Sequence, residues 1–272
     1  MTLERVAYVG LGTIGSMMAT SAARKGYEVR AFDLERARLD PLTSHGVIPV
    51  SSAADAAAAS ELIGVIVPSD DDVKAAVLGT NGVLEGAAAG SVIALHSTIT
   101  PETVLQIGEA AGKKGVSVVD APVTRGVVGT ENQMFLYMVG GEEEAVRFCE
   151  PAFSASGARI VHIGPLGSGA AMKLIQQAVL AMSKLAAFEG YRLADKLGLS
   201  LERASEVLVE QYRSSGTWLS GVKDGGAASV LLGGPDMRSV ELAQAAGQEV
   251  DQQSVPLALA YEAMKQNRPS RD

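Results

Sequence analysis

The chain has 272 residues, of which 47% are hydrophobic and 20% are charged, as is ordinary for a globular protein. That length allows a full hydrophobic core and predicts two domains. The net charge of −8 argues against nucleic acid or an anionic membrane as a partner, and no apolar stretch is long enough to cross a bilayer. Cys149 is the single cysteine, so no intramolecular disulfide can form. Without a signal-peptide pattern, the expected location is cytoplasmic.

Residues 1–164 alternate between apolar runs of strand length and helical segments. Strand, helix, strand repetition with short connections predicts an α/β fold with a mostly parallel, doubly wound sheet of the Rossmann type. The strands are expected at residues 5–10, 27–33, 46–50, 61–67, 91–95, 116–120, 133–139 and 159–163. We therefore expect a dinucleotide-binding domain over residues 1–164.

The pattern changes at the glycine-rich segment 164–169, which breaks regular structure. A long helical stretch follows at residues 170–197, and Gly198 is its natural stop. Shorter helices are expected at residues 200–212, 215–223, 236–250 and 255–266. Residues 165–272 are thus predicted to form an all-α domain that is joined to the sheet through the long helix.

The turn Gly10-Leu11-Gly12-Thr13-Ile14-Gly15 lies between the first predicted strand and a helix. Gly10 permits a sharp turn, Gly12 lets the backbone approach a pyrophosphate, and Gly15 allows close packing of helix and strand. The helix N-terminus then offers free N–H groups and a positive dipole end to phosphates. This G-x-G-x-x-G pattern in a strand–helix setting predicts a dinucleotide site.

Asp33 ends the second predicted strand. A carboxylate at this position accepts hydrogen bonds from a ribose 2′-OH and repels a 2′-phosphate, which favours NAD over NADP. Arg36 and Arg38 lie just beyond and offer charges that could serve a phosphate, so NADP stays an alternative. A second alternative is that Asp33 caps the next helix.

A further strand end is followed by Asp120-Ala121-Pro122-Val123-Thr124-Arg125-Gly126. Doubly wound sheets place ligands at such strand ends, so we expect a substrate loop here. Thr124 and Arg125 offer hydroxyl, N–H and guanidinium donors of the kind that hold a carboxylate. The alternative is a turn with an exposed arginine.

Two more strand ends carry polar residues. Ser97 and Thr98 place hydroxyls near the same crevice, although Ser97 or Thr100 could instead cap a helix. The acids of residues 68–72 are expected to cap a helix that starts near Val73 rather than to bind a metal. Since no His, Cys or carboxylate cluster has metal-binding spacing, we expect no metal site.

Lys173 lies in the first turns of the long helix, just after the glycine-rich bend. The positive end of the helix dipole disfavours a cation there, which would lower the lysine pKa toward a useful acid–base range. Gln176 and Gln177 follow on the same helical face. The alternatives are a surface lysine and two solvated amides.

Three motifs together resemble the β-hydroxyacid dehydrogenase family, which includes 3-hydroxyisobutyrate dehydrogenase and tartronate semialdehyde reductase. They are the turn at residues 10–15, the segment at residues 120–126, and Gly167-Ser168-Gly169-Ala170-Ala171-Met172-Lys173. The resemblance covers nearly the whole chain. It implies an NAD-dependent oxidoreductase that transfers a hydride between nicotinamide and the hydroxyl or carbonyl carbon of a small 3-hydroxy acid or its semialdehyde.

For the substrate, the resemblance implies that Lys173 is the catalytic acid and base. It also implies that Thr124, with the backbone of Arg125 and Gly126, binds the substrate carboxylate, while Gln177 orients the substrate. The family pattern differs here, because it usually has Ser-Gly-Gly in the loop and asparagines where this chain has glutamines. The family's second lysine is replaced by Pro235.

For the cofactor, the resemblance places Thr98 near the nicotinamide and Pro68 in the loop that lines the dinucleotide. The helical domain of such enzymes supports substrate binding and oligomers, so a homodimer or homotetramer is expected. Two other functions stay open. One is an imine or other carbonyl reductase on the same scaffold, which usually has another proton donor in place of Lys173. The other is a non-catalytic NAD-binding protein.

Overall fold

A computed structural model describes residues 3–125, 135–156 and 159–214, together with a few positions between 238 and 265. The chain divides into two compact units, Met1–Lys173 and Leu174–Asp272. The division falls within one helix, so the first turns of that helix belong to the unit that carries the sheet.

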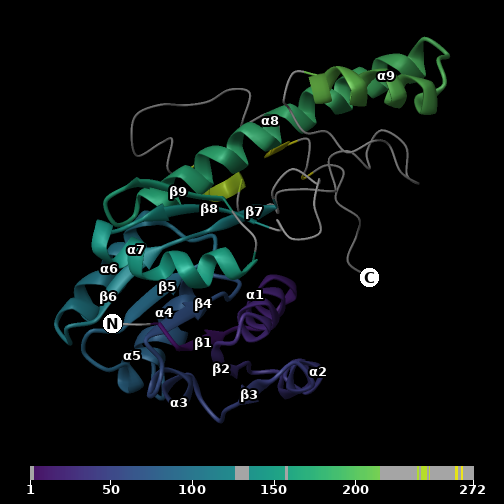
Figure 1. Ribbon diagram of the computed structural model, residues 1–272. Coiled ribbons are helices and arrows are strands. Elements are labelled where there is room, and N and C mark those ends of the chain that lie inside the picture. Colours follow the sequence, from purple (N-terminus) through teal and green to yellow (C-terminus); the bar gives the residue numbers. More distant parts are fainter. Residues whose placement is uncertain are drawn as a thin grey trace. The chain divides into compact units, whose positions relative to one another are not determined.

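The described strands of the first unit form one sheet (Figure 1). They are β1 (Arg5–Val9), β2 (Glu28–Phe32), β3 (Val47–Pro49), β4 (Leu62–Val65), β5 (Val92–Leu95), β6 (Ser117–Asp120), β7 (Val123–Arg125), β8 (Phe135–Gly140) and β9 (Arg159–Gly164). The order is β3-β2-β1-β4-β5-β6-β8-β7, and β9 pairs with β8. All pairs from β3 to β6 are parallel, which is the Rossmann strand order. The predicted doubly wound sheet is therefore confirmed.

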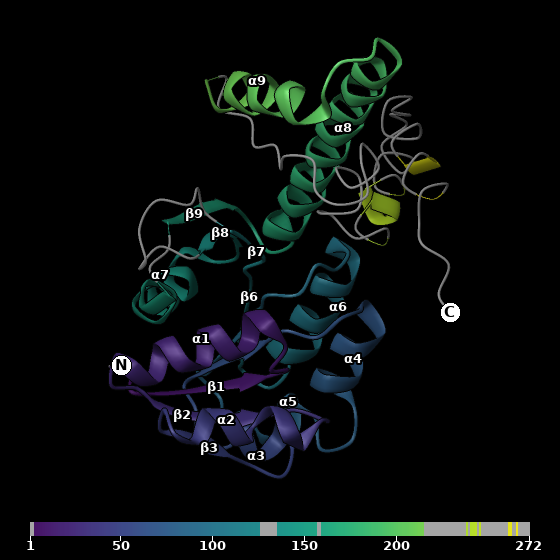
Figure 2. The ribbon, with the colours of Figure 1, turned by 90° about the vertical axis from the view of Figure 1, so that its right-hand side faces the viewer.

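Helices cover both faces of this sheet. They are α1 (Thr13–Arg24), α2 (Asp40–Thr43), α3 (Ala53–Ala57), α4 (Asp70–Leu78), α5 (Val83–Gly86), α6 (Pro101–Gly112) and α7 (Glu143–Phe153), with the 3₁₀ helices η1 (Arg36–Arg38) and η2 (Ser154–Ser156). Side chains alternate along each strand, so Val6 and Tyr8 pack with α1, α2 and α7, while Ala7 and Val9 pack with α3 to α6. Figure 2 shows α1 and α7 on one side of the strands and α4 and α6 on the other.

The segment after β6 differs from the loop that the sequence predicted. Val123–Arg125 forms β7, which pairs antiparallel with β8 so that Thr124 lies opposite Leu136. A strand of three residues that follows Pro122 has no room for an apolar alternation, so this segment carries no strand pattern of its own. Every strand that the sequence predicted overlaps a strand of the sheet, with ends that differ by at most two residues.

The second unit contains most of α8 (Ser168–Lys196) and all of α9 (Leu201–Ser214). Gly198 ends the long helix with φ +69°, and its N–H donates to Asp195 O at 3.0 Å while Leu199 N–H donates to Ala194 O at 2.9 Å. This Schellman arrangement confirms the predicted stop. The helices expected at 215–223, 236–250 and 255–266 fall mostly outside the described residues. Within the described part of the chain, no helix is long and apolar enough to cross a membrane.

Candidate functional site

The glycine turn closes tightly at two points and stays open at a third. Gly10 has φ +92°, and a Cβ on it would collide with the carbonyl of Ile66. A Cβ on Gly15 would collide with the carbonyl of Gly10. A Cβ on Gly12, by contrast, would meet nothing within 4 Å. The turn therefore packs against the sheet on one side and leaves the Gly12 backbone accessible on the other.

Helix α1 begins at this open point. Gly12 is its N-cap residue and supplies no side-chain cap, so the first N–H groups of the helix receive no such bond. No acidic side chain lies in the first turn either. A helix N-terminus of this kind attracts an anion through its free N–H groups and its dipole.

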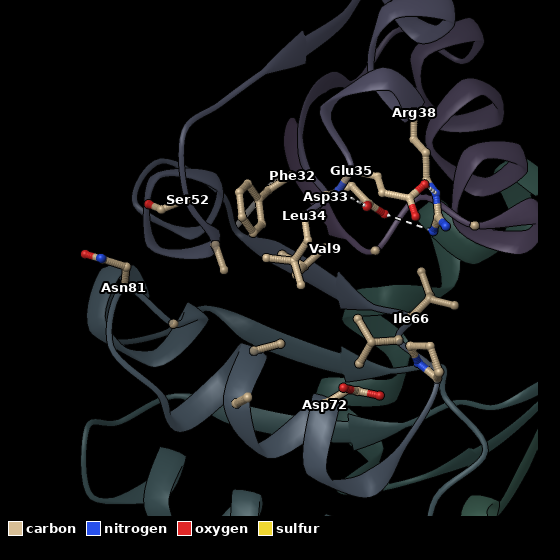
Figure 3. A pocket seen from close by; sticks show the side chains of 18 of the residues that line it. Val9, Phe32, Asp33, Leu34, Glu35, Arg38, Ser52, Ile66, Asp72 and Asn81 are labelled. Atoms are coloured by element: carbon tan, nitrogen blue, oxygen red, sulfur yellow. Dashed lines mark hydrogen bonds and ion pairs between the residues drawn. The ribbon is translucent and has the colours of Figure 1, made fainter.

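Asp33 lies at the carboxyl end of β2 and is held by backbone donors. Its Oδ2 accepts a hydrogen bond from Leu11 N–H at 2.6 Å, and its Oδ1 accepts one from Glu35 N–H at 2.8 Å. Arg38 lies 3.6 Å from Oδ2 and also binds Glu35, with Nε to Oε2 at 2.8 Å (Figure 3). The Arg38 guanidinium is thus placed between two carboxylates, which limits its attraction for a phosphate.

A cavity of about 780 Å³ opens at the carboxyl ends of β1, β2 and β4. Six of the predicted cofactor residues line it, namely Gly10, Gly12, Thr13, Ile14, Asp33 and Pro68. Leu11 and Gly15 lie behind its wall, since Leu11 is buried and holds Asp33, and Gly15 packs against the turn. Thr98 is half-buried and does not line the cavity.

Sequence reasoning missed several lining residues. Leu34 is 93% exposed and lines the cavity beside Asp33, and Ser52 and Asn81 lie at the far side (Figure 3). An exposed leucine in a loop carries no sequence pattern of its own. Only its position next to Asp33 in the sequence could have indicated that Leu34 lines the cavity.

The polar residues after β4 and β5 connect these two strand ends. Ser97 Oγ accepts a hydrogen bond from Val67 N–H at 2.8 Å. Thr100 caps α6 by accepting from Thr103 N–H at 3.2 Å, and Asp70 Oδ1 accepts from Thr100 N–H at 2.9 Å. Of the two alternatives for a helix cap, Thr100 is therefore correct, and Ser97 instead fixes the loop after β4.

The acids of residues 68–72 lie at the start of α4, which begins at Asp70 rather than near Val73, and the residue that caps it is not an acid. Ser69 is the N-cap and accepts from Asp72 N–H at 3.0 Å. Among the residues that the structure describes, no group of three or more His, Cys, Asp or Glu side chains could hold a metal ion.

His96 is buried at the end of β5. Its Nδ1 lies 2.8 Å from Ala121 O, and its ring makes edge contacts with Tyr137 and Phe153. Burial lowers the pKa of His96 to about 4 because the charged imidazolium would lose its hydration. The ring is therefore neutral at physiological pH and serves the junction of β5 and β6.

Lys173 is on α8 and is 7% exposed. Its Nζ donates to Val123 O at 2.9 Å, at the start of β7. Thr124 follows on that strand and is half-buried, and the backbone of Arg125 pairs with Phe135. The structure thus brings the lysine to the strand that carries Thr124. Gly126 lies outside the described residues, as does Pro235.

Asp120, at the end of β6, has a contact that sequence reasoning did not anticipate. It is 1% exposed, and its carboxylate accepts from Gly167 N–H at 2.8 Å and from Ala170 N–H at 2.6 Å. Burial raises the pKa of Asp120, while these N–H donors oppose the rise. The partners lie about fifty residues away in the chain, so no local pattern indicates the contact.

Gln177 and Lys184 lie further along α8, in the second unit. Gln177 is 9% exposed, and within the described residues its Oε1 has no hydrogen-bond partner. Lys184 is 2% exposed, and its Nζ likewise has no partner there. Burial lowers the pKa of Lys184 to about 8. Gln177 and Lys184 are seven residues apart, so their side chains lie on one side of the helix.

A closed glycine turn, a helix N-terminus without a side-chain cap and a strand-end carboxylate around one cavity define a dinucleotide-binding α/β protein. The profile of the NAD binding domain of 6-phosphogluconate dehydrogenase matches residues 5–164. The chain is 30% identical to the NAD-dependent L-serine dehydrogenase of Pseudomonas aeruginosa over 99% of this chain and 95% of that protein. It is 31% identical to the 3-hydroxyisobutyrate dehydrogenase of the same organism over 78% of this chain and 71% of the relative.

The fold is similar to that of 3-hydroxyisobutyrate dehydrogenase from Mycobacterium tuberculosis, which was solved with L-serine. The TM-score is 0.78 and the sequence identity 24%, over 98% of this chain and 94% of that chain. The chain belongs to the β-hydroxyacid dehydrogenase family. It is an oxidoreductase with an NAD-binding Rossmann domain, as the motifs predicted.

Proposed function

We propose that this protein oxidises the hydroxyl group of a small 3-hydroxy acid, or reduces the matching semialdehyde, with Lys173 as the general acid and base. The observation that carries the proposal is the position of Lys173. Its Nζ is held 2.9 Å from Val123 O, beside the strand that presents Thr124. A buried amine that is bonded to the residue before Thr124 suits proton transfer to a substrate whose carboxylate is bound at the same strand.

The cavity residues fit the parts of NAD. The N–H groups at the start of α1 and the open backbone of Gly12 suit the pyrophosphate. Asp33 faces the cavity with a carboxylate for the ribose hydroxyls, and Leu34 offers an exposed apolar surface for the adenine. From the family resemblance we assign Thr98 to the nicotinamide end and Pro68, which lines the cavity, to the loop beside the dinucleotide.

The chemistry requires one proton transfer and one hydride transfer. Bound NAD supplies the hydride acceptor or donor. In the oxidative direction, the neutral Lys173 amine takes the proton of the substrate hydroxyl while the C–H bond at the same carbon breaks. In the reverse direction, the ammonium donates its proton to the carbonyl oxygen. General acid–base catalysis of this kind contributes about 10²–10⁴-fold to the rate.

The substrate carboxylate is assigned to the Thr124 hydroxyl and the backbone of Arg125 and Gly126. Gln177 follows Lys173 by one helical turn, and its Oε1 lacks a partner among the described residues, so it suits a substrate hydroxyl or amine. An amine-bearing 3-hydroxy acid such as serine is therefore a first choice of substrate, in keeping with the L-serine dehydrogenase relative.

The organisation of the chain is part of this proposal. Residues 1–164 would bind the dinucleotide, and residues 165–272 would form the helical domain for substrate binding and self-association. A homodimer or homotetramer and a cytoplasmic location stay predictions from the sequence.

The test is NADH formation from a panel of 3-hydroxy acids that includes L-serine and 3-hydroxyisobutyrate. Lys173→Ala should bind NAD normally and lose turnover by about 10²–10⁴-fold. Lys196→Ala is the matched control, because Lys196 is an exposed lysine in the last turn of the same helix. Retained turnover in Lys173→Ala would contradict the role of the lysine. NAD binding without turnover of any member by the parent would favour the non-catalytic alternative.

A further inference from the structure

The start of α8 is attached to the sheet through one buried side chain. The Asp120 carboxylate accepts from Gly167 N–H with Oδ1 and from Ala170 N–H with Oδ2, at 2.8 and 2.6 Å. A carboxylate at a helix N-terminus satisfies N–H groups that would otherwise lack partners, and it interacts favourably with the helix dipole. Here that carboxylate belongs to a strand rather than to the residue that precedes the helix.

The packing around this contact leaves little freedom. A Cβ on Gly169 would collide with Met138 O, and it would lie 2.6 Å from Asp120 O. A Cβ on Gly140 would collide with Asp120 Oδ1. Glycines on both the helix and the neighbouring strand therefore let the two backbones close directly around the aspartate, and the helix start cannot shift without breaking these contacts.

The same segment also holds the lysine. Val123, three residues after Asp120, accepts the hydrogen bond from Lys173 Nζ at 2.9 Å. Lys173 follows Ala170 by three residues, so the lysine is less than one helical turn from the N–H that Asp120 binds. Residues 120–123 thus fix both the helix that carries Lys173 and the position of its amine.

We propose that Asp120 is a positioning residue for Lys173, which sets the place of the amine relative to Thr124 by anchoring the first turn of α8. This inference rests on the proposed function. A misplacement of about 1 Å at a reacting group can cost about 10²-fold in rate, and so a loosened anchor should reduce turnover with little effect on the cofactor cavity. The cavity lies at the ends of other strands and contains none of these residues.

The test is a double-mutant cycle on kcat with Asp120→Asn and Lys173→Ala. In Asp120→Asn an amide NH₂ faces a backbone N–H, and one of the two anchoring bonds is lost. We expect kcat to fall by about 10- to 100-fold while the Kd for NAD stays within about twofold. In the Lys173→Ala background, the same substitution should change the residual rate by less than about threefold, because a residue that acts through the lysine has no effect without it.

Glu61→Gln is the matched control. Glu61 is another buried carboxylate that accepts two backbone N–H bonds, from Glu4 at 3.1 Å and Arg5 at 2.6 Å, but it lies at the amino end of β4. The Glu61→Gln variant should have a lower thermal unfolding temperature, as Asp120→Asn should, and an unchanged kcat. If Asp120→Asn does not fold, Asp120→Glu takes its place in the cycle, since it keeps the charge and displaces the helix by one methylene.

The outcomes separate the two proposals. Full turnover in Asp120→Asn, or equal losses in the parent and Lys173→Ala backgrounds, would overturn the positioning role and leave the function of Lys173 intact. Full turnover in Lys173→Ala would overturn the proposed function itself. A loss in Asp120→Asn that disappears in the Lys173→Ala background supports the inference.

Discussion

Asp33 and Asp120 both lie at the ends of parallel strands of one sheet, and each accepts two backbone N–H bonds. Asp33 lies on the wall of an open cavity beside the exposed Leu34. Asp120 is enclosed by the glycines of β8 and α8 and does not line that cavity. The strand end alone does not decide what a carboxylate does. The packing around the carboxylate decides its role. An enclosed carboxylate holds backbone segments together, whereas a carboxylate on a cavity wall can bind a ligand.

This comparison predicts that changes at the enclosed junction of β5 and β6 alter stability, while changes at the cavity wall alter cofactor binding. Three measurements test this difference, in addition to those on Lys173 and Asp120.

The largest effect is expected at His96. Its pKa is about 4 in the folded protein and 6.5 ordinarily, so the unfolded chain binds a proton in that interval that the folded protein does not. The contribution of His96 to the free energy of unfolding should therefore be constant above pH 6.5 and fall by roughly 3 kcal/mol as the pH drops from 6.5 to 4. Urea unfolding at several pH values measures this.

His96→Gln is the control, since it removes the titrating ring and leaves the other acidic groups in place. The difference in unfolding free energy between parent and variant should shrink as the pH is lowered. A difference that stays constant from about pH 7 to about pH 4.5 would show that His96 does not stay neutral in the folded protein.

A second effect is expected at Asp33. Asp33→Ser removes a charge-assisted hydrogen-bond acceptor, and NAD should bind about 10- to 100-fold more weakly, or about 1.5–3 kcal/mol. NADP should gain little, because Arg38 is still paired with Glu35 at 2.8 Å. Adding Glu35→Gln frees that guanidinium, and the double variant should bind NADP more tightly than either single variant. Fluorescence titration of each variant with NAD and with NADP tests this. Strong NADP binding by Asp33→Ser alone would contradict the idea that the Glu35 ion pair occupies Arg38.

The third contrast lies within the glycine turn itself. Gly15→Ala forces a Cβ against the carbonyl of Gly10, so it should lower the free energy of unfolding by about 1–3 kcal/mol. Gly12→Ala meets open space and should leave stability nearly unchanged, but it should weaken NAD binding by about tenfold, since the methyl group occupies the path of the pyrophosphate. Thermal unfolding and NAD titration of both variants suffice. Equal stability losses would mean that Gly12 also serves packing.

Local patterns explain why one half of the site could be predicted. The turn at residues 10–15 and Asp33 lie within one strand–helix–strand unit, so spacing alone indicates their geometry, and six of the predicted cofactor residues line the cavity. The apolar runs likewise indicated the strands. Gly198 marked the end of α8 because a positive φ favours glycine.

The features that could not be predicted depend on contacts between residues that are distant in the sequence. The bonds from Asp120 to the start of α8 and from Lys173 to Val123 each join residues about fifty positions apart. β7 forms only because β8 returns beside it, and its three residues carry no pattern. Lys184 is buried on α8, although lysine side chains are almost always exposed. Such features follow from the fold and not from the local sequence.

In the proposed function, a hydride passes between a substrate carbon and NAD under the control of Lys173. The most direct measurement uses a 3-hydroxy acid that carries deuterium on its hydroxyl-bearing carbon, with mass spectrometry of the reduced cofactor. We predict one deuterium per NADH formed by the parent and by Lys196→Ala, and almost no labelled NADH from Lys173→Ala. Unlabelled NADH from the parent, or labelled NADH from Lys173→Ala at the parent rate, would contradict the account.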